Sequence, residues 1–280
     1  MEVSRRALVL GGGGITGIAW ETGILAGLAQ AGVDLISADV VVGTSAGSVV
    51  GAQILSGVTL EDLYAEQLKD PAGEIAATIG MGAIARFVIG SLWPGDERRG
   101  SARIGRAALK ARTVPESVRR SVFEERLPSR VWPERRLIIT AVDAETGEAR
   151  VFDRDSGVPL LDAVAASCAV PMVWPPITIN GHRYIDGGVR SVTNADLAAG
   201  CDRVVVLAPV GFALRRNRRI DNQLASLGRG VRSIVLSPDS QSRRAIGSNV
   251  LDPAHREASA RAGRLQARGV LDAVAAVWSA

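Results

Sequence analysis

Short apolar runs rich in Val, Ile and Leu recur along the chain and alternate with segments of helical periodicity. Strands of a parallel sheet that is covered on both faces read as continuous apolar runs, and helices connect them. The pattern therefore predicts an α/β fold, a three-layer α/β/α sandwich with a mainly parallel central sheet. The expected strands are 7–10, 36–42, 137–142, 149–152, 204–207 and 233–236, and the expected helices are 18–31, one from about 45, 60–68, 160–169 and 253–278.

A β-hairpin is expected late in the chain. Residues 177–179 and 183–185 flank Asn180-Gly181, a dipeptide that favours a type I′ turn because both residues tolerate positive φ. The second strand of the hairpin leads directly into Asp186-Gly187-Gly188. The hairpin would therefore deliver a carboxylate to one end of the sheet.

A single domain is expected over residues 1–280, because a chain of this length can bury one large core. Residues 70–133 lack the regular alternation and are expected to form a helical cap insertion, with helices over 102–111 and 115–126. The apolar patch 79–93 within it is interpreted as core, and the alternative is contact with lipid or an acyl chain.

The segment Gly43-Thr44-Ser45-Ala46-Gly47 has the GxSxG pattern of a nucleophile elbow. It follows an apolar strand and precedes a helix, which is the context that such an elbow requires. Gly43 and Gly47 would give the strained turn the space it needs, while Ser45 stands above the sheet edge. The backbone amide of Ala46, at the start of the helix, is then a candidate donor for an oxyanion.

Two interpretations compete for the glycine loop that follows the first strand. Gly12, Gly14 and Gly17 satisfy GxGxxG, the dinucleotide fingerprint, but that motif also needs an acidic residue at the end of the second strand, and none stands there. The favoured alternative is that Gly12, Gly13 and Gly14 expose backbone amides as an oxyanion hole. Neighbouring parallel strands would bring this loop beside Ser45.

Asp186 is the predicted partner of Ser45. A serine alcohol needs a base within hydrogen-bond reach, and a carboxylate can accept its proton directly. Gly187 and Gly188 would relieve crowding where the loop approaches another chain segment. The competing interpretation is that Asp-Gly-Gly forms only a turn.

Neither metal nor disulfide chemistry is expected from the composition. Cys168 and Cys201 are far apart in the sequence and have no CxxC partner, and His182 and His255 are the chain's two histidines. We therefore expect no metal site, no cofactor and no disulfide framework.

A cytoplasmic protein is expected, because the sequence shows no export or membrane-spanning signal. The apolar run before the glycines has only about four residues, too few for a signal peptide. The stretch 76–93 is interrupted by Arg86.

Of 33 basic residues only Lys69 and Lys110 are lysines, which indicates a GC-rich, bacterial genome. Nucleic acid is not an expected partner, because the basic run 215–219 has no interleaved aromatic residues. A net charge of +4 permits peripheral contact with an anionic membrane.

Taken in order, the glycine loop, the GxSxG segment and the Asp-Gly-Gly segment resemble the patatin-like phospholipase family. The similarity extends over residues 7–208 and includes the segments 166–171, 174–176 and 181–185. The resemblance implies a Ser/Asp dyad hydrolase that acts on acyl esters of lipids without a metal. It assigns Ser45 as the nucleophile, Asp186 as the base and Gly12 to Gly14 as the oxyanion loop.

Two positions depart from the family pattern. The family usually has a basic residue where Thr16 stands, so this chain lacks that positive charge beside the oxyanion loop. The usual NxP that follows Asp-Gly-Gly reads Asn194-Ala195-Asp196 here. Neither change removes an atom of the dyad, but the first concerns preference for a phospholipid headgroup.

The sequence therefore predicts a lipid acyl hydrolase, either a phospholipase, a lysophospholipase or a carboxylesterase, that works through an acyl-enzyme. Its expected partner is a lipid or another acyl ester, and the sequence carries no signal for an oligomeric state. Two alternatives remain open. One is a Ser-His-Asp α/β-hydrolase that uses His255 or His182 as its base, and the other is a non-catalytic protein of similar fold that binds lipid or nucleotide.

Overall fold

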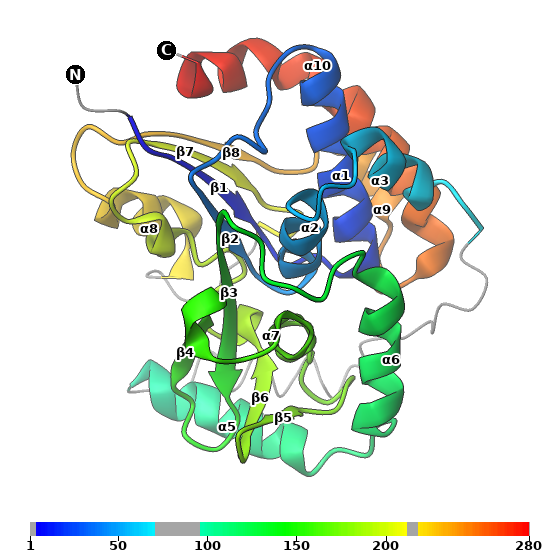
Figure 1. Ribbon diagram of the computed structural model, residues 1–280, viewed down its shortest axis with the longest axis vertical. Coiled ribbons are helices and arrows are strands. Elements are labelled where there is room, and N and C mark those ends of the chain that lie inside the picture. Colours follow the sequence, from blue (N-terminus) through cyan, green and yellow to red (C-terminus); the bar gives the residue numbers. More distant parts are fainter. Residues whose placement is uncertain (1–3, 71–95, 212–217, 280) are drawn as a thin grey trace.

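A mixed eight-stranded sheet forms the centre of the protein (Figure 1). The computed structural model describes residues 4–70, 96–211 and 218–279. The strand order is β5-β6-β3-β2-β1-β7-β8, with β4 paired to β3. The strands are β1 (Arg6–Leu10), β2 (Val40–Gly43), β3 (Arg136–Asp143), β4 (Ala149–Phe152), β5 (Ile177–Ile179), β6 (His182–Asp186), β7 (Arg203–Leu207) and β8 (Arg232–Leu236).

Two halves of different pairing make up this sheet. Strands β3, β2, β1, β7 and β8 run parallel to one another. Strands β4 and β6 pair with β3 in the antiparallel sense, and β5 completes a hairpin with β6. The mainly parallel sheet and the late hairpin are thus both confirmed, and β3 is the strand at which the two halves meet.

Alternate residues of the central strands pack on opposite faces. Leu8 and Leu10 of β1 belong to one buried cluster, whereas Ala7 and Val9 belong to another. Helices α1, α2 and α10 cover the first face and α8 lies on the second, so the three-layer α/β fold is confirmed (Figure 1). The helices are α1 (Gly14–Gln30), α2 (Ala46–Ile54), α3 (Leu60–Gln67), α5 (Glu97–Leu109), α6 (Glu116–Arg126), α7 (Leu160–Ser167), α8 (Ile220–Ser226), α9 (Ser240–Ile246) and α10 (Arg256–Trp278).

The long C-terminal helix α10 packs mainly against α1, with further contacts to β7 and β8. Glycines permit the close approach of the two helices. A Cβ at Gly23 would lie 2.2 Å from the Ala260 carbonyl oxygen, and one at Gly263 would lie 2.4 Å from the Trp20 carbonyl oxygen. Helix α1 therefore packs against α10 and also against α3 and α2.

Some element boundaries differ from the sequence prediction. The strand expected from residue 36 begins only at Val40, because Asp34 caps a turn by accepting the Ile36 amide at 2.9 Å. Helix α5 starts at Glu97, earlier than predicted, because Asp96 acts as its N-cap and accepts the Arg98 amide. The type I′ hairpin turn is confirmed by positive φ at Asn180 (50°) and Gly181 (81°).

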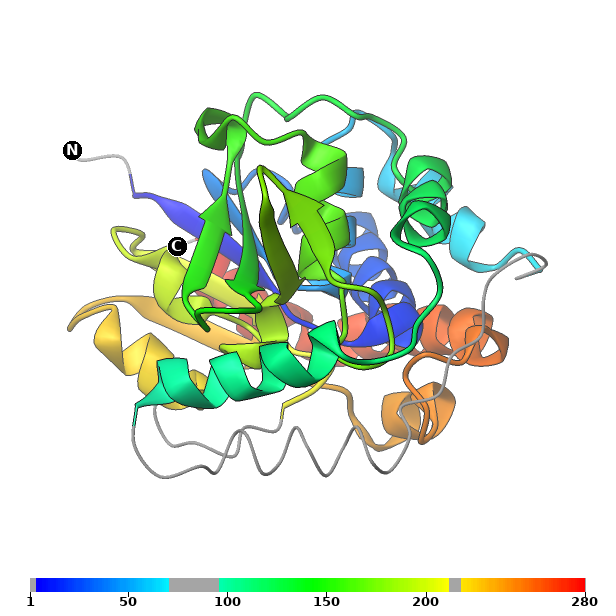
Figure 2. The ribbon, with the colours of Figure 1, turned by 90° about the horizontal axis from the view of Figure 1, so that it is seen from below.

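Helices α5 and α6 are the described part of the predicted insertion. Ile104 and Ala108 of α5 pack against β3 and β6, where Figure 2 shows the helix running across their ends. Phe123 of α6 is buried in the large cluster beneath the sheet. The apolar patch 79–93 lies outside the described residues. Among the described helices, none has the length and apolar character needed to cross a bilayer.

Candidate active site

Ser45 lies at a sharp turn between β2 and α2. Its backbone adopts φ 52° and ψ −116°, a region that non-glycine residues occupy only when the surroundings impose it. The following turn is packed so closely that a Cβ at Gly47 would lie 2.1 Å from the Leu10 carbonyl oxygen. The chain therefore has the strained strand–turn–helix geometry of a nucleophile elbow.

Two residues from the end of α7 hold the strained peptide of Ser45. The Ser45 amide donates to Ser167 Oγ at 2.9 Å, and the Ser45 carbonyl accepts from Cys168 Sγ at 3.2 Å. Burial raises the pKa of Cys168 to about 12, so the thiol keeps its proton and can donate. Ser48 Oγ donates to the same carbonyl at 2.7 Å. Sequence reasoning noted the 166–171 segment but gave these side chains no role.

The glycine loop lies directly beside the elbow. Gly12, Gly13 and Gly14 all line the same cavity as Ser45. The Gly12 amide donates to the Val192 carbonyl at 2.7 Å, so it is occupied within the protein. Among the described residues, the amides of Gly13, Gly14 and Ala46 have no acceptor. These three amides are thus the available donors near Ser45.

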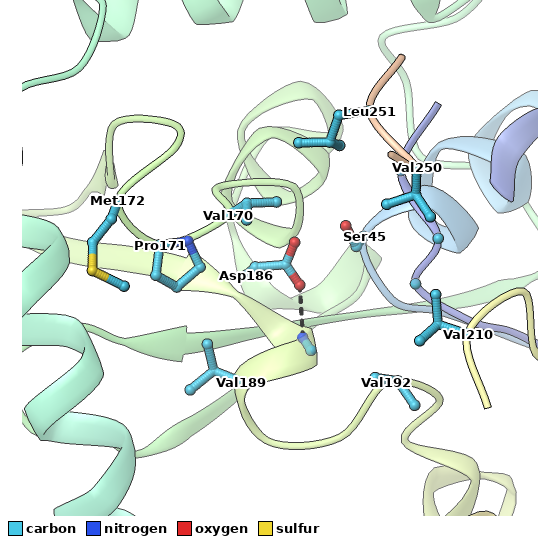
Figure 3. Close-up of a pocket in the computed structure, with 14 residues that line it drawn as sticks. Ser45, Val170, Pro171, Met172, Asp186, Val189, Val192, Val210, Val250 and Leu251 are labelled. Carbon is cyan, nitrogen blue, oxygen red and sulfur yellow. Dashed lines mark hydrogen bonds between the residues drawn. The ribbon is translucent and has the colours of Figure 1, made fainter. Parts of the chain in front are cut away.

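Asp186 ends β6 and lies beside Ser45 at the cavity (Figure 3). The Gly188 amide donates to its Oδ1 at 2.7 Å. Burial raises the pKa of Asp186 to about 6, against the opposing effects of the Ser45 hydroxyl, of the hydrogen bond from Gly188 and of the charge on Arg119. A carboxylate with this pKa is ionised at neutral pH and is still basic enough to accept a proton.

The glycines flanking the dyad are required by close contacts. A Cβ at Gly43 would lie 2.6 Å from the Ser48 Cα, and one at Gly187 would lie 2.5 Å from the Thr140 carbonyl oxygen. At Gly188 a Cβ would lie 2.9 Å from the Oδ1 of Asp186 itself. These contacts agree with the turn roles that the sequence predicts for these glycines.

The cavity in front of the dyad has a volume of about 250 Å³. Apart from Ser45, Asp186 and glycines, its described lining is entirely apolar, as Figure 3 shows. The apolar lining residues are Val170, Pro171, Met172, Val189, Val192, Val210, Val250 and Leu251. The arrangement places a serine hydroxyl, a carboxylate and free amides together in the wall of an aliphatic pocket.

A buried polar network joins the two halves of the sheet behind the dyad. Asn194, in the left-handed region at φ 52°, donates through Nδ2 to Thr44 Oγ1 at 3.0 Å and to Thr140 Oγ1 at 3.2 Å. Where the family pattern has proline, Asp196 forms an ion pair with Arg190, which also donates to Asn194 Oδ1 at 2.5 Å. The departure at Asp196 is thus accommodated by a local ion pair.

Thr16 is buried rather than facing the cavity. Its amide and its hydroxyl both donate to the Val250 carbonyl oxygen, at 3.2 and 3.3 Å. The position therefore fixes the 250–251 segment against α1.

Arg119 of α6 brings a positive charge near the site. It is buried and stacks on the Trp174 ring at 4.0 Å, and its charge partly offsets the rise in the pKa of Asp186 that burial causes. Sequence reasoning missed this residue.

Neither histidine lies at the cavity. His182 Nδ1 is 3.2 Å from Asp143 Oδ2 on the exposed end of the hairpin, and His255 Nδ1 is 2.8 Å from the Ala245 carbonyl oxygen at the start of α10. Neither is among the residues that line the pocket around Ser45. The geometry therefore offers no histidine as the base.

Comparison with known proteins and structures identifies the family of this chain. Curated proteins include none that matches the chain. Among solved structures, VipD from Legionella pneumophila is similar in fold, with a TM-score of 0.50 and 14% identity over 96% of this chain and 67% of that one. The type III effector protein ExoU aligns with a TM-score of 0.42 and 17% identity over 97% of this chain and 53% of that one, so the chain spans about half the length of ExoU. A profile described as patatin-like phospholipase matches residues 8–199, well over half of the sequence. On this match, the chain belongs to the patatin-like phospholipase family.

Proposed function

We propose that the protein is a lipid acyl hydrolase that cleaves carboxylic esters with Ser45 as nucleophile and Asp186 as base. The family supports lipid acyl hydrolysis in general terms. The observation that carries the specific proposal is the position of both side chains at one apolar cavity, where burial raises the pKa of Asp186 to about 6.

In the proposed first step, Ser45 Oγ attacks the ester carbonyl carbon while Asp186 accepts the hydroxyl proton. The carbonyl oxygen becomes an oxyanion and accepts hydrogen bonds from the amides of Gly13, Gly14 and Ala46, with Gly12 holding the loop through Val192. Collapse of this intermediate breaks the ester bond. The departing alcohol takes the proton from Asp186 and leaves an acyl group on Ser45.

In the second step, Asp186 accepts a proton from a water molecule that attacks the acyl-serine carbonyl. The second tetrahedral intermediate is held by the same amides. Its collapse returns the proton to Ser45 Oγ and releases the carboxylic acid. The Ser45 side chain is thereby restored without a cofactor or metal being consumed.

The cavity favours an acyl chain over a charged headgroup as its occupant. Its described lining contains aliphatic side chains and no basic one. Burial of each methylene of a ligand contributes about 0.8 kcal/mol, so an aliphatic wall favours the hydrocarbon part of a lipid ester. The proposed substrate class is therefore fatty-acyl esters presented from a lipid surface.

The proposal is tested by labelling with a fluorophosphonate and by hydrolysis of p-nitrophenyl esters of short and long acyl chains. Ser45→Ala and Asp186→Asn are each expected to abolish labelling and to lower kcat by about 10⁴-fold or more, as in other serine hydrolases.

His182→Ala and His255→Ala serve as matched controls and are expected to retain activity within about twofold, since both side chains lie away from the cavity. Loss of activity in either histidine variant would favour a Ser-His-Asp hydrolase instead. Saturable lipid binding by the native protein without labelling or turnover would favour a non-catalytic role.

A further inference from the structure

Glu21 is a buried carboxyl that the proposed mechanism does not use. It lies within α1, on a helix whose residues from 15 to 28 are all buried, and none of its surface is exposed. Its Oε1 accepts the Gly11 amide at 2.9 Å, at the first residue of the glycine loop. Its Oε2 is buried and has no hydrogen-bond partner among the described residues.

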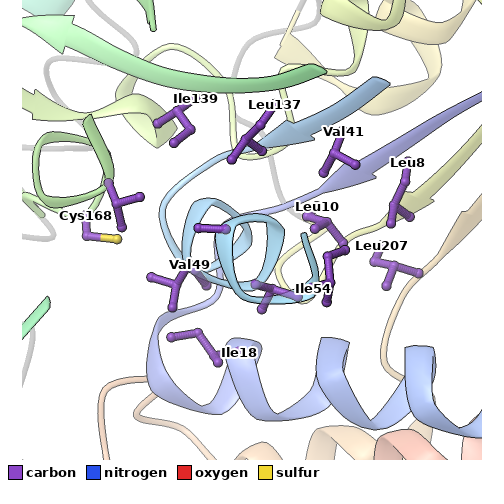
Figure 4. Close-up of a cluster of buried hydrophobic side chains, with 14 of the residues drawn as sticks. Leu8, Leu10, Ile18, Val41, Val49, Ile54, Leu137, Ile139, Cys168 and Leu207 are labelled. Atoms are coloured by element: carbon purple, nitrogen blue, oxygen red, sulfur yellow. The ribbon is translucent and has the colours of Figure 1, made fainter. Parts of the chain in front are cut away.

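Gly11 is the point at which the glycine loop and the elbow are joined. Its amide donates both to Glu21 and to the Leu207 carbonyl, at 2.9 Å in each case, and its own carbonyl accepts the Gly47 amide at 3.0 Å. Figure 4 shows α2, which carries Val49 and Ile54, between helix α1 and the strands that carry Leu10 and Val41. A displacement of Gly11 would therefore move the oxyanion donors and the nucleophile together.

A neutral carboxyl at Glu21 is compatible with a position behind the oxyanion loop. Burial raises the pKa of Glu21 well above its usual value of 4.5, which favours the neutral form of the carboxyl. An ionised carboxylate there would oppose the negative charge that develops on the substrate oxygen. A neutral carboxyl supplies the acceptor for Gly11 without that repulsion.

A purely structural role is a poor explanation for an acid at this position. An apolar side chain would fill the space without a buried oxygen that lacks a partner, which costs stability. We propose that Glu21 is a positioning residue that fixes Gly11, and through Gly11 the geometry of the oxyanion loop relative to Ser45. This inference rests on the proposed hydrolase function.

The test compares Glu21→Leu, which removes the acceptor, with Glu21→Gln, whose amide oxygen keeps it. Glu21→Leu is expected to lower kcat about tenfold or more, with KM within about twofold, because the loop acts in the transition state. The rate of fluorophosphonate labelling should fall in the same proportion. Glu21→Gln is expected to stay within about threefold of the native protein in both measurements.

Thr22→Val is the matched control, because Thr22 is equally buried and its hydroxyl donates to the Ile18 carbonyl, away from the loop. It is expected to leave kcat unchanged. Native kcat in Glu21→Leu, a tenfold loss in Glu21→Gln, or a similar loss in Thr22→Val would each overturn the inference. Should Glu21→Leu not fold, Glu21→Met takes its place with the same expected losses.

Hydrogen exchange separates this inference from the proposed function. The amides of residues 11–14 are expected to exchange faster in Glu21→Leu than in the native protein or Thr22→Val, whether or not any ester is hydrolysed. Unchanged exchange would overturn the positioning role. Absence of native turnover with the expected exchange pattern would instead count against the hydrolase proposal.

Discussion

The parallel and antiparallel halves of the sheet contribute to the site in different ways. The parallel half carries Ser45 and the glycine loop, which are held largely by backbone hydrogen bonds between segments too close for side chains, as at Gly47. The antiparallel half carries Asp186 at the end of a hairpin whose turn, at Gly181, lies in open space. Ser45 is thus surrounded by packed backbone, whereas Asp186 ends β6, the inner strand of a hairpin whose outer strand, β5, forms the edge of the sheet.

This difference suggests that the two halves tolerate change to different degrees. A shift of the hairpin moves Asp186 first, whereas a shift at the ends of β1 and β2 moves Ser45 and the amides of the glycine loop together. Strand β3 connects the two halves, and its Thr140 contacts both Thr44 and Asn194. Substitutions on each side of this junction test the comparison.

The largest expected effect is on the parallel half. Gly47→Ala would place a Cβ 2.1 Å from the Leu10 carbonyl oxygen, in a region where backbone cannot move independently. We expect a loss of about 3 kcal/mol or more in the free energy of unfolding, or no folding at all. Gly181→Ala on the hairpin meets no atom within 4 Å and should cost only about 1–2 kcal/mol, from its positive φ. Urea unfolding measures both, and equal losses would contradict the comparison.

The next effect concerns the pH dependence of the base. In the proposed mechanism Asp186 acts in its ionised form, so kcat/KM is expected to fall about tenfold per pH unit as pH drops below about 6, the value to which burial raises its pKa. A pH–rate profile between pH 4 and 8 measures this, and a profile without a bend near pH 6 would exclude Asp186 as the base.

Stability should change in the opposite direction. The folded state holds the Asp186 proton more tightly than the unfolded state, so the native protein loses stability as pH rises from 3.8 to about 6. Asp186→Asn is therefore expected to gain stability relative to the native protein over this window, by up to about 3 kcal/mol at neutral pH. Thermal unfolding at pH 4 and pH 8 provides the measurement.

The smallest effect is expected at the junction between the halves. Thr140→Val removes the hydroxyl that lies 3.1 Å from Thr44 Oγ1 and accepts from Asn194. It should cost about 1–2 kcal/mol in stability and reduce kcat several-fold. Thr178→Val, which loses an exposed hydrogen bond to Glu116 at the hairpin, should cost less than about 0.5 kcal/mol and leave kcat unchanged.

Much of the fold was predictable because local chemistry and global structure agree in this chain. Continuous Val-rich runs became the parallel strands, and Asn180-Gly181 became the expected turn. These features depend on residues that are close in sequence. Periodicity and turn preferences read such features directly.

The unpredicted features depend on contacts between segments far apart in the sequence. Ser167 and Cys168 hold the Ser45 peptide across more than 120 positions, and Val192 occupies the Gly12 amide. No rule based on the spacing of residues in the sequence predicts such contacts. One signal was present for Glu21, because an acid in the middle of an otherwise apolar helix requires a buried partner.

The chain segments that supply the pocket wall affect how this protein could change over evolutionary time. Most of the aliphatic side chains in this wall come from segments near residues 170, 210 and 250, which contribute neither the hydroxyl, the carboxylate nor the free amides, whereas Val189 and Val192 follow Asp186 closely. Mutations in these segments can enlarge, shorten or reshape the space for a ligand while the reacting groups keep their positions. The size of the pocket and the proposed chemistry therefore depend largely on different residues, so single substitutions in the wall can alter the space for a ligand on their own.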